Sequence, residues 1–167
     1  NIYSVNSTLL PYSTPETYDE YMKSINTLTQ EHSETEAEKE QTEYVINLSG
    51  GYGAHLMDEV YRYSCAAAAI AAEDDFDIIH VHDWMAYPAG IMAKNISGKP
   101  LVVHAHSLER DRSGENINGD VAHIEWMGFS QADKVISVSQ YTKNLIMRDY
   151  LIPESKIEVV HNAVTRK

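Results

Sequence analysis

The chain has 167 residues, of which 43% are hydrophobic and 23% are charged, a balance that fits one globular domain with its own core. Thirteen basic against twenty-five acidic side chains give a net charge of −12, which disfavours binding to nucleic acid or to anionic membranes. The single cysteine, Cys65, excludes an internal disulfide and a zinc site made of several thiolates. No segment is typical of a signal peptide or of a membrane span, so we expect a cytoplasmic protein without membrane insertion.

The first part of the chain predicts two helices separated by a polar segment. A capping-box pattern predicts a helix over residues 15–30, and helical spacing of apolar residues predicts another over 53–72. The acidic residues 31–43 are expected to form a surface excursion. The glycine cluster at 50–53 has no strand before it and no Lys-Ser/Thr after it, which favours a turn over a phosphate loop.

The second part of the chain alternates apolar runs of strand length with longer helical segments. Each run is apolar at several consecutive positions, as expected for strands that are covered on both faces. The predicted strands are 77–82, 100–106, 134–138 and 156–161, and the predicted helices lie near 86–97, 120–132 and 140–150, the last with Ser139 as N-cap. This order predicts an α/β fold, a Rossmann-like parallel sheet with helices on both faces.

Histidines gather at the ends of two predicted strands. Ligands of an open parallel sheet bind beyond the carboxyl ends of its strands, so these side chains are candidates for a site. Strand alternation directs His80 and His82 to one face, and likewise His104 and His106. We expect the outer members, His82 and His106, to reach the ligand edge. The inner members, His80 and His104, are interpreted as core residues that donate to backbone carbonyls.

The residue types at this edge allow more than one chemistry. Neutral imidazoles with Asp83 would suit a metal if their ring nitrogens converged, which a sequence does not establish. Proton transfer or electrostatic catalysis is a second possibility, for which His106, Asp83 and Glu109 supply an imidazole and carboxylates near one substrate. The metal site is the less favoured of these, and no metal ligand is predicted. Trp84 is typical either of a surface that stacks on a sugar ring or of a residue packed at the start of a helix.

Alternating charges follow the second of these strands, over residues 107–114. Arg110 and Arg112 suit a phosphate or a carboxylate, and Glu109 and Asp111 suit hydroxyl groups, so a loop that clasps an acceptor is one interpretation of the segment. A surface network in which these charges satisfy one another is the alternative, and it is slightly favoured.

Four segments, in the same order, resemble the retaining GT-B glycosyltransferases of the glycogen synthase and sucrose synthase group, often called family four. They are the run Asp-Ile-Ile-His-Val-His-Asp-Trp at 77–84, the strand and loop at 102–114, the Val-Ser-x-x-x-Lys pattern at 138–146 and Val-His-Asn-Ala-Val at 160–164. The chain departs from the family pattern at Ala163, where glycine is usual, and at His161, where proline is more common.

The resemblance implies a two-domain enzyme whose N-terminal domain receives the acceptor and whose C-terminal domain binds the nucleotide sugar. We therefore expect residues 1–167 to be part of the acceptor-side domain without its first strand, with the donor domain absent and no activity alone. The implied reaction transfers a hexose, glucose in the first place, from a nucleotide diphosphate sugar to a glucan or other glycan with retention and without a cofactor. Expected partners are these substrates, the protein's own C-terminal domain and a second copy of the chain at an exposed sheet edge.

The resemblance also implies the roles of individual residues. His106 and Asp83 are predicted as catalytic, His106 beside the transferred sugar and Asp83 beside the acceptor. Substrate binding is predicted for Asn162 on the resemblance, and for five further residues on their type and position: His82, Trp84, Glu109, Arg110 and Arg112. Two other functions remain open, a non-catalytic carbohydrate-binding or regulatory module of the same origin, and an epimerase or phosphorylase of GT-B architecture.

Overall fold

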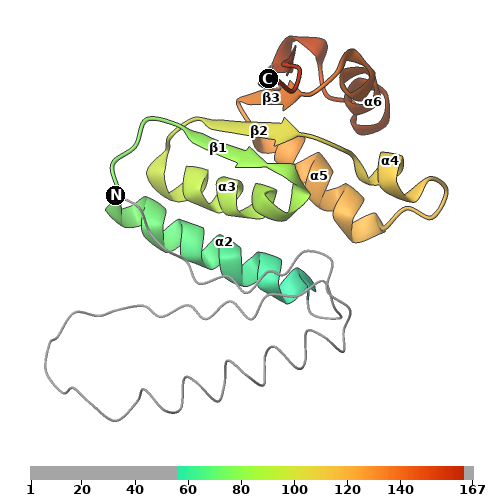
Figure 1. Ribbon diagram of the computed structural model, residues 1–167. Helices are drawn as coiled ribbons and strands as arrows, with labels where there is room; N and C mark the ends of the chain where they lie inside the picture. The colour runs from blue at the N-terminus through green and yellow to red at the C-terminus, as the bar shows by residue number, and fades with distance from the viewer. Residues whose placement is uncertain (1–55, 164–167) are drawn as a thin grey trace, which may run out of the picture. The chain divides into compact units, whose positions relative to one another are not determined.

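The computed structural model describes residues 56–163 (Figure 1). The predicted helix at 15–30, the acidic excursion at 31–43 and the glycine turn at 50–53 lie outside the described residues. The helix predicted over 53–72 corresponds to α2 (Leu56–Glu73). The chain divides into the units Asn1–Arg62 and Tyr63–Lys167, and the features below belong to the second. Within residues 56–163, no helix combines the length and the apolar character needed to cross a bilayer.

The sheet has four parallel strands in the order β1-β2-β3-β4. Each strand lies within its predicted range and differs from it by at most two residues at either end: β1 Ile79–His82, β2 Leu101–Ala105, β3 Lys134–Ser137 and β4 Ile157–Val159. The register pairs His82 with His104, so the carboxyl ends of β1 and β2 are adjacent. The predicted α/β class with a parallel sheet is confirmed.

The helices between the strands also follow the prediction, with two differences. They are α3 (Asp83–Ser97), α4 (Glu109–Ser113), α5 (Gly119–Gln131) and α6 (Gln140–Tyr150), followed by the 3₁₀ turn η1 (Glu154–Lys156). The hydroxyl of Ser139 accepts a hydrogen bond from the Thr142 amide at 3.0 Å, which confirms the predicted N-cap. Helix α3 begins directly after β1, earlier than predicted, and α4 lies in a segment predicted as a loop.

One face of the sheet carries the hydrophobic core beneath α3, α5 and α6. Leu101, Val103 and Val135 are fully buried there. Helix α3 runs close to the strands because Gly90 has no side chain: a Cβ at that position would lie 2.8 Å from Leu101 Cδ1 and 2.9 Å from Val81 Cγ1. Figure 1 shows α3 alongside β1 and β2.

Aromatic rings join the three helices into one layer. The Phe129 ring of α5 meets the Tyr87 ring of α3 with centroids 5.6 Å apart and the Tyr150 ring of α6 at 5.2 Å, both edge to face. Gly128 allows this contact, because a Cβ there would lie 2.3 Å from the Tyr87 ring. The strand residues that point to the opposite face, among them His80, His104 and Ile136, are exposed or half-buried. Cover by helices is therefore seen on one face in the described residues, and on the second face it stays a prediction.

Candidate functional site

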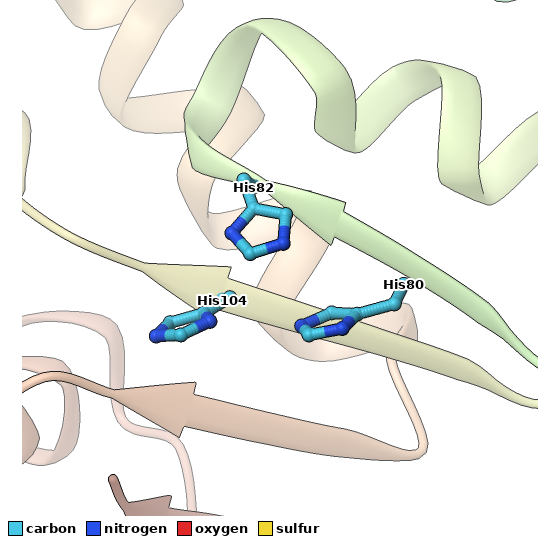
Figure 2. A group of neighbouring side chains, drawn as sticks. All are labelled: His80, His82 and His104. Atoms are coloured by element: carbon cyan, nitrogen blue, oxygen red, sulfur yellow. The ribbon is translucent and has the colours of Figure 1, made fainter. Parts of the chain in front are cut away.

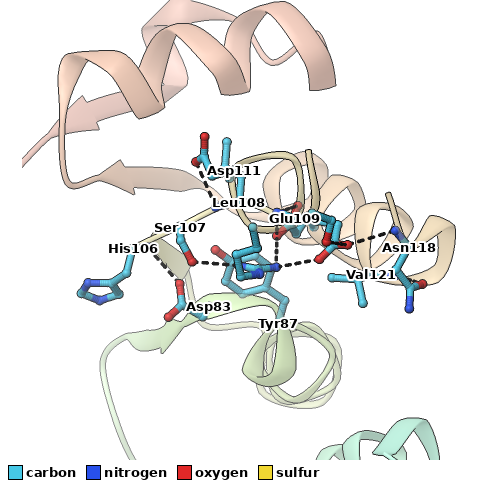
Figure 3. Close-up of polar contacts among 12 residues, drawn as sticks. Asp83, Tyr87, His106, Ser107, Leu108, Glu109, Asp111, Asn118 and Val121 are labelled. Carbon is cyan, nitrogen blue, oxygen red and sulfur yellow. Dashed lines mark hydrogen bonds and ion pairs between the residues drawn. The ribbon is translucent and has the colours of Figure 1, made fainter. Parts of the chain in front are cut away.

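Asp83 ties the end of β1 to the end of β2. It has a φ of 58°, in the left-handed region that residues other than glycine rarely adopt, and it begins α3 directly after His82. Its Oδ1 atom accepts a hydrogen bond from the backbone amide of His106 at 2.9 Å (Figure 3). Backbone strain of this kind is concentrated at functional sites, because the surrounding structure must hold it in place.

The two outer histidines are in direct contact. Nδ1 of His82 lies 3.0 Å from Nε2 of His106, a hydrogen bond in which one ring donates and the other accepts. Both rings are exposed, so they remain within reach of a ligand. The structure thus brings together three of the predicted site residues, His82, Asp83 and His106, at the carboxyl ends of neighbouring strands.

The inner histidines do not have the role expected of them. His80 is exposed, and within residues 56–163 neither ring nitrogen of His104 has a hydrogen-bond partner, although both atoms are buried. The expected bonds to backbone carbonyls fail because strand side chains stand perpendicular to the sheet, whereas strand carbonyls point along its plane. Burial, reinforced by the neighbouring ring of His106, lowers the pKa of His104 to about 4. Partial loss of solvent around the ring, together with the neighbouring rings of His82 and His106, lowers the pKa of His80, although the residue as a whole is exposed.

Arg112, one of the two arginines of the charged segment, is held by acceptors within the protein. The Arg112 guanidinium donates to the Ser107 hydroxyl at 2.8 Å, to Glu125 at 3.0 Å and to Glu109 at 3.3 Å (Figure 3). Glu109 is buried and also accepts from the Ser113 hydroxyl and from the Asn118 amide. Burial opposes ionisation of Glu109, but these hydrogen bonds outweigh it and lower the pKa of the carboxyl.

Glu125 is the centre of this network and was not predicted. Only 1% of the residue is exposed, and its carboxylate accepts the Tyr150 hydroxyl and the Glu109 amide as well as Arg112. Burial raises the pKa of Glu125 despite these donors. Its position four residues after buried Val121 and four before buried Phe129 places a carboxylate on the apolar stripe of α5, and that spacing is the sequence signal that could have identified it.

The remaining predicted residues lie farther from the histidines or make other contacts. Arg110 is exposed, and its Nε lies 3.7 Å from Asp149 of α6. Trp84 is half-buried in the first turn of α3. Asn162 is exposed after β4, a strand separated from β1 by β2 and β3. The geometry of Glu109 and Arg112 corresponds to the alternative of a self-satisfied network, and substrate binding by these five residues stays a prediction.

The arrangement offers two kinds of chemistry. Paired imidazoles beside a carboxylate can bind hydroxyl groups and exchange protons near neutral pH. His80, His82 and His104 also bring one ring nitrogen each within 4.8 Å of one another, a donor set that suits a transition metal.

Comparison with known proteins assigns the chain to a family. The profile described as Glycosyltransferase Family 4 matches residues 27–167. A glycosyltransferase of Methanocaldococcus jannaschii, named as uncharacterized, is 32% identical over 57% of this chain and 25% of its own length. The D-inositol 3-phosphate glycosyltransferase of Salinispora tropica is 27% identical over 70% of the chain and 27% of its own length. The alpha-maltose-1-phosphate synthase of Mycolicibacterium smegmatis is 30% identical over 69% of the chain and 33% of its own length.

These matches cover a quarter to a third of the relatives' own length. The profile match, in contrast, extends over most of the chain and includes every strand of the sheet and the edge at which His82, Asp83 and His106 meet. The chain therefore belongs to glycosyltransferase family 4.

Proposed function

We propose that the complete protein transfers a hexose, glucose in the first place, from a nucleotide diphosphate sugar to a hydroxyl group of an acceptor, with retention of configuration. In this proposal the chain supplies the acceptor side of the site. The observation that carries it is the convergence of His82, Asp83 and His106 at the carboxyl ends of β1 and β2, where Asp83 adopts a strained backbone conformation.

His106 is assigned to the reacting sugar. Its ring is exposed at the end of β2, its backbone amide is bound by Asp83, and the hydrogen bond with His82 orients the imidazole. An imidazole in this position can hydrogen-bond the hydroxyl groups of the donor sugar and stabilise charge that develops on the ring in the transition state. Fixing the group before the reaction keeps the cost of reorganisation low.

Asp83 and His82 are assigned to the acceptor. Each carboxylate oxygen accepts more than one hydrogen bond, so Asp83 can order an acceptor hydroxyl while it holds the amide of His106. His82 forms a hydrogen bond with His106, so the tautomer of His82 determines which ring nitrogen of His106 carries the proton. Trp84, in the next turn, offers an aromatic surface for the apolar side of a sugar ring.

The class of acceptor is proposed from the residues and from the relatives together. The histidine and aspartate edge suits a glucan or another glycan as acceptor, because its imidazole and carboxylate groups can form hydrogen bonds with hydroxyl groups. Two of the relatives have names that contain a phosphorylated polyol or a phosphorylated sugar. The exposed guanidinium of Arg110 suits a phosphate, so phosphorylated acceptors belong in the same screen as glucans.

Binding of the nucleotide sugar donor is assigned to groups outside the edge formed by His82, Asp83 and His106. The chain has a net charge of −12, which does not suit the diphosphate of a leaving nucleotide, so the basic groups that stabilise it are expected in a second domain. No cofactor enters the proposed reaction.

The test is a screen of the complete gene product with nucleotide diphosphate sugars, each paired with glucans, sugar phosphates and polyol phosphates. Release of the nucleoside diphosphate that depends on both substrates is the expected result, and the anomeric configuration of the product, read by NMR, checks retention. Absence of release with every pair would overturn transfer. Acceptor binding without release would instead identify a carbohydrate-binding module.

A further inference from the structure

Three histidines on the face of the sheet opposite the helices point toward one another (Figure 2). His80 and His82 come from β1 and His104 comes from β2. Their ring centroids are 4.5 Å apart for His80 and His82, 4.9 Å for His82 and His104, and 5.6 Å for His80 and His104. One nitrogen from each ring lies within 4.8 Å of the other two. The ring nitrogens are therefore close together, which the sequence leaves open.

The ring nitrogens of His104 are the unsatisfied members of this set. Both are buried and lack a hydrogen-bond partner among the residues that the structure describes, a costly arrangement for a polar group in a folded protein. A neutral imidazole with a free lone pair is the form that binds a metal.

We propose that His80, His82 and His104 form a binding site for a divalent transition metal, with Zn²⁺ as the preferred ion, that joins β1 to β2. Zinc binds imidazole nitrogens at about 2.0–2.1 Å, which puts two tetrahedral ligands about 3.4 Å apart. The observed limit of 4.8 Å closes to that spacing through rotation of the rings, two of which are exposed. Three imidazoles leave the fourth position of the metal to a water molecule.

The donor set determines which ions fit. Imidazole ligands suit Zn²⁺, Cu²⁺ and Ni²⁺, whereas Mg²⁺ and Ca²⁺ require oxygen ligands, and no oxygen belongs to this set. The net charge of −12 raises the local concentration of any cation and does not distinguish among them. Binding of Zn²⁺ in preference to Mg²⁺ therefore distinguishes a specific imidazole site from the general attraction of cations to an acidic protein.

Metal binding also affects the neighbouring edge. With the metal on Nε2 of His82, the proton of that ring lies on Nδ1, which donates to Nε2 of His106 across the observed 3.0 Å contact. The ion would then fix the tautomer of both outer histidines. The metal site itself rests on the geometry of the three rings and does not depend on sugar transfer.

The experiment is isothermal titration of the full chain, stripped with a chelator, with ZnCl₂ and with MgCl₂. We expect one Zn²⁺ per chain and no binding of Mg²⁺. Replacing a ligand in H80N should weaken Zn²⁺ binding at least about tenfold, because even the loss of groups that only support a ligand costs 10–100-fold. The matched control is H123N, since His123 is an exposed histidine of α5 outside the cluster.

A second measurement tests the role of His104, the half-buried histidine of the three. The thermal midpoint should rise with Zn²⁺ for the wild-type chain and for H123N, because an ion that binds the folded state stabilises it, and should rise less for H80N and H104N. A folded H104N chain, checked by circular dichroism, that still binds Zn²⁺ with wild-type affinity would overturn the proposal. So would absence of Zn²⁺ binding by the wild-type chain, or equal weakening by H80N and H123N.

Discussion

The two ends of the sheet use polar residues in opposite ways. At the amino ends, Asp133 accepts the ammonium of Lys94 at 2.8 Å and the backbone amide of Leu101 at 2.7 Å through one oxygen. At the carboxyl ends, Asp83 accepts the amide of His106 at 2.9 Å, but in a strained conformation and beside exposed imidazole rings. Both aspartates tie neighbouring strands together, and only the second does so next to groups that can take part in chemistry.

This difference indicates that the polar contacts at the amino ends of the strands serve stability, whereas the polar groups at the carboxyl ends serve function. The bonds of Asp133 satisfy the first amide of β2 and hold α3 against the start of β3, so their value is structural. The strained backbone of Asp83 and the exposed imidazole rings at the other end do not stabilise the fold to a comparable degree. We therefore expect substitutions at the amino ends to reduce stability, and substitutions at the carboxyl ends to reduce activity.

The largest loss of stability is expected below the carboxyl edge, at the buried Glu125. E125Q replaces one accepting oxygen with an NH₂ group, which leaves either Arg112 or the Tyr150 hydroxyl without its acceptor, so the free energy of unfolding should fall by about 1–3 kcal/mol, the cost of an unsatisfied buried polar group. Urea unfolding measures it. The control E158Q, at an exposed carboxylate of β4, should change stability by less than about 0.5 kcal/mol. Equal effects would contradict the account of Glu125 as a buried support.

A smaller loss is expected at the amino ends. D133N keeps an oxygen for the Leu101 amide but removes the charge that attracts Lys94, so the free energy of unfolding at neutral pH should fall by about 1 kcal/mol. Unfolding in urea, compared with wild type at the same pH, measures the difference. A variant as stable as the wild type would show that Asp133 does not close this edge.

The pH dependence of the same pair of proteins sharpens the test. The hydrogen bond from Lys94, followed by that from Leu101, lowers the pKa of Asp133 below its ordinary 3.8. The unfolded chain then binds more protons than the folded one below pH 3.8, so stability from Asp133 is present above that pH and is lost as pH falls through the folded value. The difference between wild type and D133N should shrink in acid. A difference that stays constant down to acid pH would contradict the shift.

Asp83 should affect stability still less. Asparagine tolerates the left-handed conformation and keeps an oxygen that accepts the His106 amide, so D83N should unfold within about 0.5 kcal/mol of the wild type. Its loss of charge should reduce kcat/KM if the carboxylate orders the acceptor. Urea unfolding and nucleoside diphosphate release, measured on the same preparation, check both outcomes. A variant that loses stability and keeps full activity would place Asp83 with the structural aspartate at the other end.

Local patterns in the sequence were enough to predict much of the fold. The helix over 140–150 begins after its predicted cap, Ser139, because a capping hydroxyl and an amide three residues on are close in sequence. All four strands follow from their apolar runs. Helix α4, five residues of alternating charge, carries no apolar periodicity and was predicted as a loop.

The site was predictable only in part, because its contacts join distant segments. Strand alternation correctly grouped His82 with His106 at one edge. It did not reveal that Glu125 reaches Arg112, thirteen residues earlier, since that contact depends on how α5 lies beneath α4. Nor did it reveal that the nitrogens of His104 find no partner in the described part of the chain, because this depends on the contacts made across the sheet face.

The most direct test of the difference between the two ends is to measure kcat/KM and unfolding together for H106A and D133N in the complete protein. H106A should lower kcat/KM by about 10²–10³, the cost of removing one group that stabilises transition-state charge. Its ring is exposed, and what it loses is the stacking on His104 and one hydrogen bond with His82, so the free energy of unfolding should change by no more than about 1 kcal/mol. D133N should lose stability with kcat/KM retained. Loss of stability in H106A equal to its loss of activity, or an active H106A beside an inactive, stable D133N, would contradict the assignment of the carboxyl edge as the functional end of the sheet.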